Sequence, residues 1–247
     1  MAGLAISLTA CAFNLAPAPI WTHGDRTRAV VALTFDDGPN GRCTEGVLDA
    51  LAATGTPAAF FLVGSFVDRA IDDALLARMV REGHTLGVHG YWHNAIRRTF
   101  FSDLTADDLR TTANSISHAL DRGSQPTPPI GYYRPPYGFY TTASRRGVAR
   151  AGFRLVTWAV SVNDWPSWRQ ADDIVAPIMA RVHAGDVIVL HDGTESGGNS
   201  QRTCLDHPAL AEAIRRLIPA LHAAGLTPVP LATLLADPPP PPRPGGG

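Results

Sequence analysis

Two adjacent carboxylates at the end of an apolar segment constrain this chain more than any other feature. The segment from Thr34 to Pro39 reads Thr-Phe-Asp-Asp-Gly-Pro, and it ends the apolar run 29–35, which is typical of a buried strand. Neighbouring side chains on a strand point to opposite sides, so Asp36 and Asp37 can have different partners. A buried carboxylate without a partner is too costly to keep. The sequence therefore predicts a metal ion or an arginine beside this pair.

Two histidines four residues apart are candidate metal ligands. His89 and His93 follow another apolar run, and their spacing lets both imidazoles face one side of a turn. Two histidines and one carboxylate, with a fourth position open for water, form a common catalytic zinc site. The pair alone is weak evidence, since two surface histidines give the same pattern, and Gly90 stands where a zinc protease has glutamate. The pair gains weight only together with Asp37.

Three more polar clusters follow apolar runs further along the chain. Residues 134–138 read Arg-Pro-Pro-Tyr-Gly, residues 163–165 read Asn-Asp-Trp, and residues 189–192 read Val-Leu-His-Asp. With the two clusters above, five polar clusters stand where strands end. A (β/α) barrel builds its active site from the C-terminal ends of its strands, so this layout favours such a barrel.

Strand-like runs alternate with segments of helical periodicity. The seven runs cover residues 30–35, 58–63, 85–89, 130–133, 154–160, 186–191 and 226–230. The apolar stripes of two intervening helices are Ile71, Leu75, Leu76, Met79 and Val80, and Leu210, Ile214, Leu217, Ile218 and Leu221. Thr105, with Asp108 three residues later, predicts a helix start. The alternation predicts an α/β fold, a distorted (β/α) barrel of about seven parallel strands, over residues 29–236.

Over residues 29–235 the chain resembles the polysaccharide deacetylases of the NodB-homology type, carbohydrate esterase family 4. That family has five ordered motifs, T-F-D-D-G-P, H-[S/T]-x-x-H, R-x-P-Y/F-G, D-x-x-D-W and L-x-H. This chain keeps their order, with the first and third intact. The resemblance implies the same barrel fold. It also implies removal of acetyl groups from N-acetylhexosamine glycans such as peptidoglycan, chitin oligomers or a surface polysaccharide.

The resemblance implies a metal site and a base. Asp37, His89 and His93 would hold a divalent metal, most readily Zn²⁺, with Co²⁺ or another first-row ion also compatible with these ligands. Asp36 would be the general base, and Arg134 would pair with it.

The resemblance also implies an acid and a substrate pocket. His191 would be the general acid, with Asp164 as a further catalytic candidate beside it. The backbone N–H of Tyr137 would contribute to an oxyanion hole. The residues expected to contact substrate are Pro136, Trp165 and Val189.

Three positions depart from the motifs. Gly90 replaces a Ser or Thr whose hydroxyl would brace the loop between the histidines, so we expect a looser loop. Ser161 replaces the first Asp of the fourth motif, which leaves two alternatives: Asp164 orients His191, or the acid is tuned in another way. Val189 replaces Leu in the fifth motif and changes the pocket wall slightly.

Two other functions stay open at this point. An O-acetyl esterase acting on xylan or a similar polysaccharide would use the same site. A non-catalytic glycan-binding envelope protein on a degraded scaffold is a different class, which only Gly90 and Ser161 favour. Retention of Asp36, Asp37 and His191 argues against it.

Charge and chain ends bear on partners and compartment. The formal net charge is −1, which does not indicate nucleic acid as a partner and is compatible with a neutral glycan. We expect a monomer. Residues 1–28 precede the predicted domain. Within them, Leu-Thr-Ala-Cys ending at Cys11 resembles a lipobox, without the basic residues of a signal peptide. We expect export to the periplasm, the envelope or the exterior, and a lipidated Cys11 would allow membrane association.

The remaining cysteines and the C-terminal segment allow two further predictions. Cys43 follows the first motif and Cys204 follows the fifth, on the same face of the predicted barrel, so we predict a disulfide between them. Residues 237–247 are rich in Pro and Gly and are expected to form a solvated tail.

Overall fold

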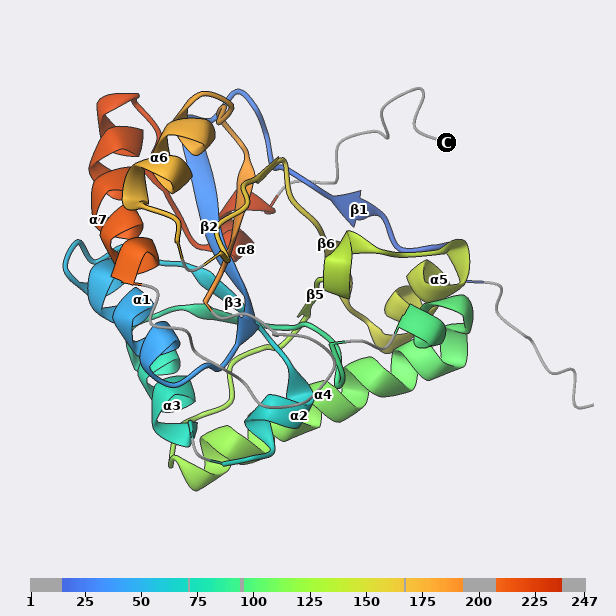
Figure 1. Cartoon of the computed structure of the whole chain (residues 1–247). Coiled ribbons are helices and arrows are strands. Elements are labelled where there is room, and N and C mark those ends of the chain that lie inside the picture. Colours follow the sequence, from blue (N-terminus) through green and yellow to red (C-terminus); the bar gives the residue numbers. More distant parts are fainter. Residues whose placement is uncertain (1–14, 71, 94–95, 167, 193–207, 237–247) are drawn as a thin grey trace, which may run out of the picture.

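A parallel sheet forms the centre of the molecule. The computed structural model describes residues 15–70, 72–93, 96–166, 168–192 and 208–236 (Figure 1). The strands are β1 (Ile20–Trp21), β2 (Val30–Gly38), β3 (Ala59–Leu62), β4 (Thr85–Val88), β5 (Tyr132–Tyr133), β6 (Arg154–Val156), β7 (Val160–Ser161), β8 (Val187–His191) and β9 (Thr227–Pro228). Their order is β1-β6-β5-β4-β3-β2-β8-β7, with β9 beside the start of β2. The pairs along this order are all parallel.

The connection between β6 and β7 requires this sheet to curl. The two strands lie six strand spacings apart in the sheet order, about 29 Å if the sheet were flat. Only four Cα steps separate Val156 from Val160, and these span at most about 15 Å. The sheet therefore bends round until residues 157–159 cross from one side to the other. Thr157 N–H donates to Trp21 O and Ala159 N–H donates to Val187 O. The crossing segment is therefore hydrogen-bonded to β1 on one side and to β8 on the other. The predicted distorted (β/α) barrel is confirmed.

Helices surround the barrel (Figure 1). They are α1 (Arg42–Ala52), α2 (Gly64–Val67), α3 (Asp73–Arg81), α4 (Ser102–Arg122), α5 (Thr142–Ala151), α6 (Ala171–Met179), α7 (Pro208–Ala223) and α8 (Leu231–Leu234), with 3-10 turns η1 (Ile96–Phe100) and η2 (Pro136–Gly138). In Figure 1, α1, α3, α6 and α7 lie on one side, α4 runs beneath the sheet, and α5 lies on the other side. The apolar stripe predicted for α7 is buried throughout, and Leu76 and Met79 of α3 are buried as predicted.

The core has two layers that follow the alternation along β2. Val31, Leu33 and Phe35 belong to the large cluster between sheet and helices. Ala32 faces a smaller cluster inside the barrel, which also contains Phe61. Small and large side chains, such as Ala32 and Phe61, fill this inner cluster together, and the polar residues described below lie at the end of β2.

Three features differ from the sequence-based expectations. The run 154–160 is not one strand but two, because β6 and β7 pair with different neighbours. Strand β1 lies within the segment 1–28 that we expected to precede the domain, yet it pairs with β6. Thr105 does not start a helix: α4 begins at Ser102, and the Thr105 hydroxyl donates to Phe101 O inside it. Within the described part of the chain, no helix has the length and apolar character needed to span a bilayer.

Candidate active site

The end of β2 carries both carboxylates of the first motif. A register shift interrupts the pairing of β2 with β3 between Asp36 and Gly38, and Asp37 has a φ of 76°. Strict alternation would put the two side chains on opposite faces of the strand. The bulge re-aims Asp37, as bulges beside active sites commonly do, so both carboxylates line one cavity at the barrel mouth.

Asp37, His89 and His93 converge as predicted. The Nε2 atoms of His89 and His93 lie 3.3 and 3.1 Å from Asp37 Oδ1, and the three ligand atoms lie within 4.8 Å of one another. Asp37 Oδ1 is buried and has no hydrogen-bond partner among the described residues. An orphaned, buried carboxylate oxygen facing two imidazole nitrogens fits a metal ion with these three ligands.

The electrostatics of these groups agree with metal binding. Burial alone would raise the pKa of Asp37, but the two imidazoles of His89 and His93 beside its carboxylate outweigh burial and hold it well below its usual range. His89 Nδ1 lies 2.8 Å from the carbonyl of Arg134. A donor role for Nδ1 leaves Nε2 as the lone-pair nitrogen directed at Asp37, which is the tautomer that a metal ligand needs.

Asp36 forms a buried ion pair with Arg134. Arg134 Nη1 lies 2.7 Å from Asp36 Oδ1 and 2.8 Å from the Thr34 hydroxyl. The same guanidinium donates to the carbonyls of Val156 and Thr157, where the chain crosses between β6 and β7. Arg134 is fully buried, so each of these donors is satisfied by protein rather than by water. Its place beside Asp36 agrees with the prediction.

Opposite the metal ligands, His191 is held by Asp164. One oxygen of Asp164 lies 2.8 Å from His191 Nδ1, and the other accepts the His191 backbone N–H at 2.7 Å. Of the two alternatives left open by Ser161, the structure therefore favours orientation of His191 by Asp164. Burial would lower the pKa of His191, but Asp164, with smaller contributions from Asp37 and Asp36, raises it to about 9.

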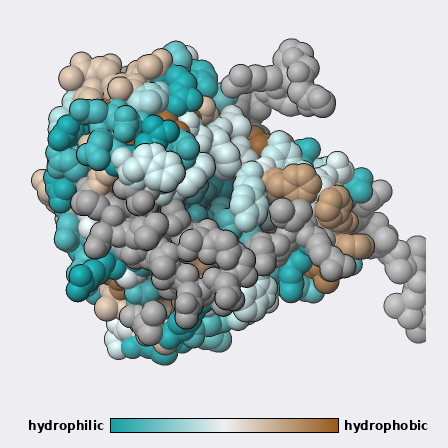
Figure 2. All heavy atoms as spheres, in the orientation of Figure 1, coloured by the Kyte–Doolittle hydropathy of each residue, from teal (hydrophilic) through white to brown (hydrophobic). Residues whose placement is uncertain are grey.

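A cavity of about 450 Å³ joins these groups. Its lining residues are Asp36, Asp37, His89, His93, Tyr137, Trp158, Ser161, Trp165 and His191. Aromatic rings form much of the wall: Tyr137 meets His93 edge to face at 4.7 Å, and Trp165 meets His191 at 5.0 Å. Figure 2 shows a hollow with hydrophilic walls near the centre of the face in view. The cavity has the size and mixed polar and aromatic lining of a small-ligand site.

Two predicted substrate contacts do not line this cavity. Val189 pairs with Thr34 in the sheet and is buried beneath His191. Pro136 is buried and lines a separate, small cavity beside Gly90. Tyr137, one residue later, adopts a left-handed φ of 58° and turns into the main cavity.

Sequence reasoning missed Trp158 and Ser161 as cavity residues. Trp158 lies in the crossing segment between β6 and β7, which we expected to be strand interior. A Cβ atom at Gly138 would lie 2.7 Å from the Trp158 ring, so the glycine of the third motif makes room for this ring. Nothing in the sequence links this tryptophan to that glycine, because only the fold brings the two residues together.

Comparisons with known proteins agree with the fold and the site. A sequence profile of the family described as polysaccharide deacetylase matches residues 23–156. The chain is 36% identical over 211 residues to a chitooligosaccharide deacetylase of Bradyrhizobium sp. (strain ANU 289), which covers 84% of this chain and 91% of that protein.

Two solved structures share the fold over most of their length. One is the Bc1960 peptidoglycan N-acetylglucosamine deacetylase in complex with a benzamide compound, with a TM-score of 0.73, 27% identity, and 88% of this chain and 92% of that chain covered. The other is a family 4 acetyl xylan esterase from Clostridium thermocellum in complex with a cobalt ion, with a TM-score of 0.68, 27% identity, and 83% and 89% covered.

Fold and site together define a barrel hydrolase whose three converging ligands fit a metal ion. The chain belongs to the polysaccharide deacetylase family. The family assignment made from the five motifs is confirmed.

Proposed function

We propose that this polysaccharide deacetylase hydrolyses the N-acetyl groups of an N-acetylglucosamine glycan, either a chitooligosaccharide or peptidoglycan. One observation carries the proposal: three converging candidate metal ligands and a second carboxylate face His191 across one cavity. The similarity to deacetylases of both substrate classes supports the choice of sugar.

Asp37, His89 and His93 would hold the metal. A divalent ion bound there supplies an acidified water molecule and a Lewis acid for the acetyl carbonyl. Two imidazoles and one carboxylate suit zinc in a catalytic site, and we propose zinc on that ground.

Asp36 serves as the general base. Its Oδ1 is held by Arg134, and its Oδ2 lies 4.0 Å from His89 Nε2, on the side of the metal ligands. The guanidinium of Arg134 offsets the cost of burying this carboxylate, and the oxygen on the side of the metal ligands can accept the proton of the attacking water.

His191 returns a proton to the departing amine. Asp164 holds its Nδ1, so the Nε2–H of the imidazolium is the proton that faces the cavity. A pKa of about 9 keeps this acid charged at neutral pH. The Tyr137 N–H, preceded by two prolines that restrict the backbone, is proposed as a donor to the oxyanion.

Acetate release is the direct test. N-acetylglucosamine oligomers, peptidoglycan and acetylated xylan should be incubated with the protein, with and without a chelator, followed by added Zn²⁺. We expect release from an N-acetylated substrate that the chelator abolishes and Zn²⁺ restores. Acetate release from acetylated xylan alone would replace this proposal with the O-acetyl esterase. Acetate release that is unchanged by the chelator would contradict the metal site.

Replacing Asp164 with asparagine should move the alkaline limit of activity. His191 must be protonated to act, so its raised pKa places the alkaline limb of kcat/KM near pH 9. The variant loses the charge that raises this pKa, while burial still lowers it, so the limb should shift to lower pH by about 2 units. Measured pH–rate profiles check this. An unshifted alkaline limb would mean that His191 is not the acid.

We also propose export and a disulfide. The proposed substrates lie outside the cytoplasm, and an oxidising compartment suits a bridge between Cys43 and Cys204. Cys43 lies in the first turn of α1, close to the end of β2, whereas Cys204 and Cys11 lie outside the described residues. Cell fractionation and the mass difference between reduced and unreduced protein would test both proposals.

A further inference from the structure

The two candidate metal-binding histidines are positioned in different ways. His89 directly follows β4: its N–H donates to Leu62 O at 2.8 Å, and its Nδ1 contacts Arg134 O. His93 follows a three-residue loop and belongs to no strand. The place of its imidazole, 3.1 Å from Asp37 Oδ1, therefore depends on how residues 90–92 are held.

Two neighbouring helices hold this loop. At α2, the N–H groups of Gly64 and Ser65 donate to the carbonyls of Gly90 and Tyr91 at 3.0 and 2.9 Å. At α4, Asp108 Oδ2 accepts the Tyr91 N–H at 3.0 Å. The loop is thus bonded through its carbonyls on one side and through an N–H group on the other, and the second contact depends on a single side chain.

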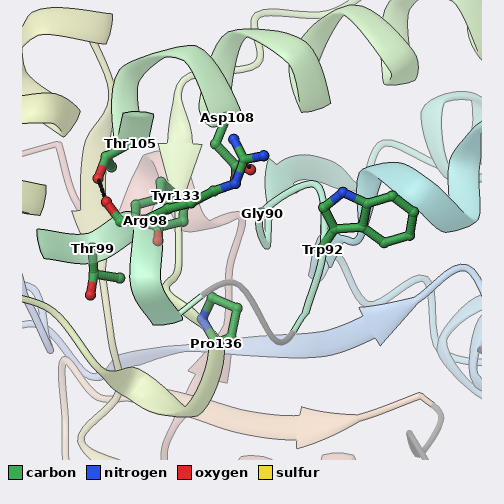
Figure 3. Close-up of a pocket in the computed structure, with 8 residues that line it drawn as sticks. All are labelled: Gly90, Trp92, Arg98, Thr99, Thr105, Asp108, Tyr133 and Pro136. Carbon is green, nitrogen blue, oxygen red and sulfur yellow. Dashed lines mark hydrogen bonds and ion pairs between the residues drawn. The ribbon is translucent and has the colours of Figure 1, made fainter. Parts of the chain in front are cut away.

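Asp108 occupies a closed environment beside the loop. Figure 3 shows it reaching from α4 toward Gly90, next to the guanidinium of Arg98, while Trp92 points away. Arg98 Nη1 lies 3.5 Å from Asp108 Oδ1, and that oxygen accepts no hydrogen bond from the described residues. The adjoining cavity of about 20 Å³ has room for about one water molecule.

The environment of Asp108 is a poor one for stability. Burial raises its pKa, and the Tyr91 N–H and the charge of Arg98 oppose that shift only in part. A carboxylate held in the protein by one neutral donor and one long ion pair generally costs the fold more than a well-packed apolar side chain would. Stability does not account for a carboxylate at this position, but the need to hold the Tyr91 N–H does.

Gly90 makes the contact possible. Its φ of 88° is a left-handed conformation that glycine adopts without strain, and a Cβ atom there would lie 3.3 Å from Asp108 Oδ2. We expected Gly90 to loosen the loop because it lacks a bracing hydroxyl. In the structure, the brace comes from the carboxylate of Asp108 on α4.

We infer that Asp108 is a positioning residue for the metal site: its carboxylate fixes the Tyr91 N–H and thereby sets the loop that carries His93. The inference rests on the proposed role of His93 as a metal ligand. Residues that orient metal ligands through a second contact typically change metal affinity by about 10- to 100-fold when replaced.

The test compares two replacements of Asp108 with a control on the same helix. Asp108→Leu keeps the approximate shape of the side chain and removes the acceptor, and Asp108→Asn keeps an oxygen for the Tyr91 N–H. Asp107→Leu alters the adjacent carboxylate, whose side chain is 70% exposed and pairs with Arg110. The measurements are Zn²⁺ affinity by calorimetry, the absorption spectrum of the Co²⁺-loaded protein, and thermal unfolding of the metal-free protein, all without substrate.

We expect Asp108→Leu to bind Zn²⁺ about 10- to 100-fold more weakly and to change the Co²⁺ spectrum, without lowering the unfolding temperature of the metal-free protein. Asp108→Asn and Asp107→Leu should stay within about threefold of the unmodified protein. Asp108→Ala replaces the leucine variant if the latter does not fold.

Unchanged Zn²⁺ affinity and an unchanged Co²⁺ spectrum in the leucine or alanine variant would overturn the inference. So would an asparagine variant that loses as much affinity as the leucine variant, because the accepting oxygen would then not be what matters. Since no substrate is present, these outcomes are independent of which acetylated glycan the enzyme hydrolyses.

Discussion

Asp36→Asn is expected to lower kcat for acetate release on the order of 10³-fold, the usual size of a lost general base. The asparagine keeps the shape of the side chain beside Arg134 but accepts no proton from water. Because Asp36 is not among the three converging ligands, Zn²⁺ affinity should change by no more than about threefold. Steady-state kinetics with N-acetylglucosamine oligomers, together with calorimetric Zn²⁺ titration, measure both quantities.

Asp37→Asn is the matched comparison, one residue away on the same strand. It removes the carboxylate that both His89 and His93 approach, so activity and Zn²⁺ binding should fall together. Two variants that lose metal to the same extent would show that Asp36 is a ligand rather than a base. An Asp36→Asn enzyme with more than one-tenth of the original kcat would rule out the base role.

The parts of the site that the sequence predicted share one physical property. Asp36, Asp37, His89 and His191 each stand at or just beyond the end of an apolar run, and parallel strands bring such ends to one rim of the barrel. Local sequence patterns were therefore enough to predict that these residues lie close together. The bulge at Asp37 was not predictable in this way, because it depends on the register of β2 against β3.

What the sequence did not reveal depends on contacts between distant segments. Strand β1 contains two residues, too few for any alternation to be recognised, and it forms because β6 offers a free edge. The break between β6 and β7 leaves no mark in an apolar run, since it arises from closure of the barrel. Asp108 read as a capping residue three positions after Thr105, and only the packing of α4 against the loop at Gly90 reveals its partner.

Arg134 has one contact that the sequence predicted and others that depend on the fold. Its motif predicted a partner for Asp36, which the structure bears out, but not that the guanidinium also donates to Val156 and Thr157 at the crossing between β6 and β7. It stacks on Phe61 inside the barrel at 4.2 Å. One side chain thus pairs with the proposed base and donates hydrogen bonds to the seam of the sheet, the segment where the chain crosses from β6 to β7. Its loss should therefore affect both catalysis and folding.

Arg134→Met should lower the free energy of unfolding by about 3–5 kcal/mol, the usual loss when one partner of a buried pair is removed. Asp36 would stay buried without a counter-charge, and the carbonyls of Val156 and Thr157 would lose their donor. In a chain of this size, a loss of that magnitude corresponds to a decrease in Tm of about 10 °C. The control is Arg154→Met, an exposed arginine on β6 that donates to Leu235 O, for which we expect about 1 kcal/mol or less.

The double variant Asp36→Asn with Arg134→Met separates the two roles of the pair. Removing both charges relieves the unpaired carboxylate, so stability should recover in part relative to Arg134→Met alone. The hydrogen bonds to Val156 and Thr157 stay lost, so recovery should be incomplete, and activity should stay as low as in Asp36→Asn. Chemical denaturation of all four proteins gives the coupling energy. A coupling energy near zero would mean that the 2.7 Å contact between Asp36 and Arg134 contributes nothing to the fold, and that the arginine acts only through the seam.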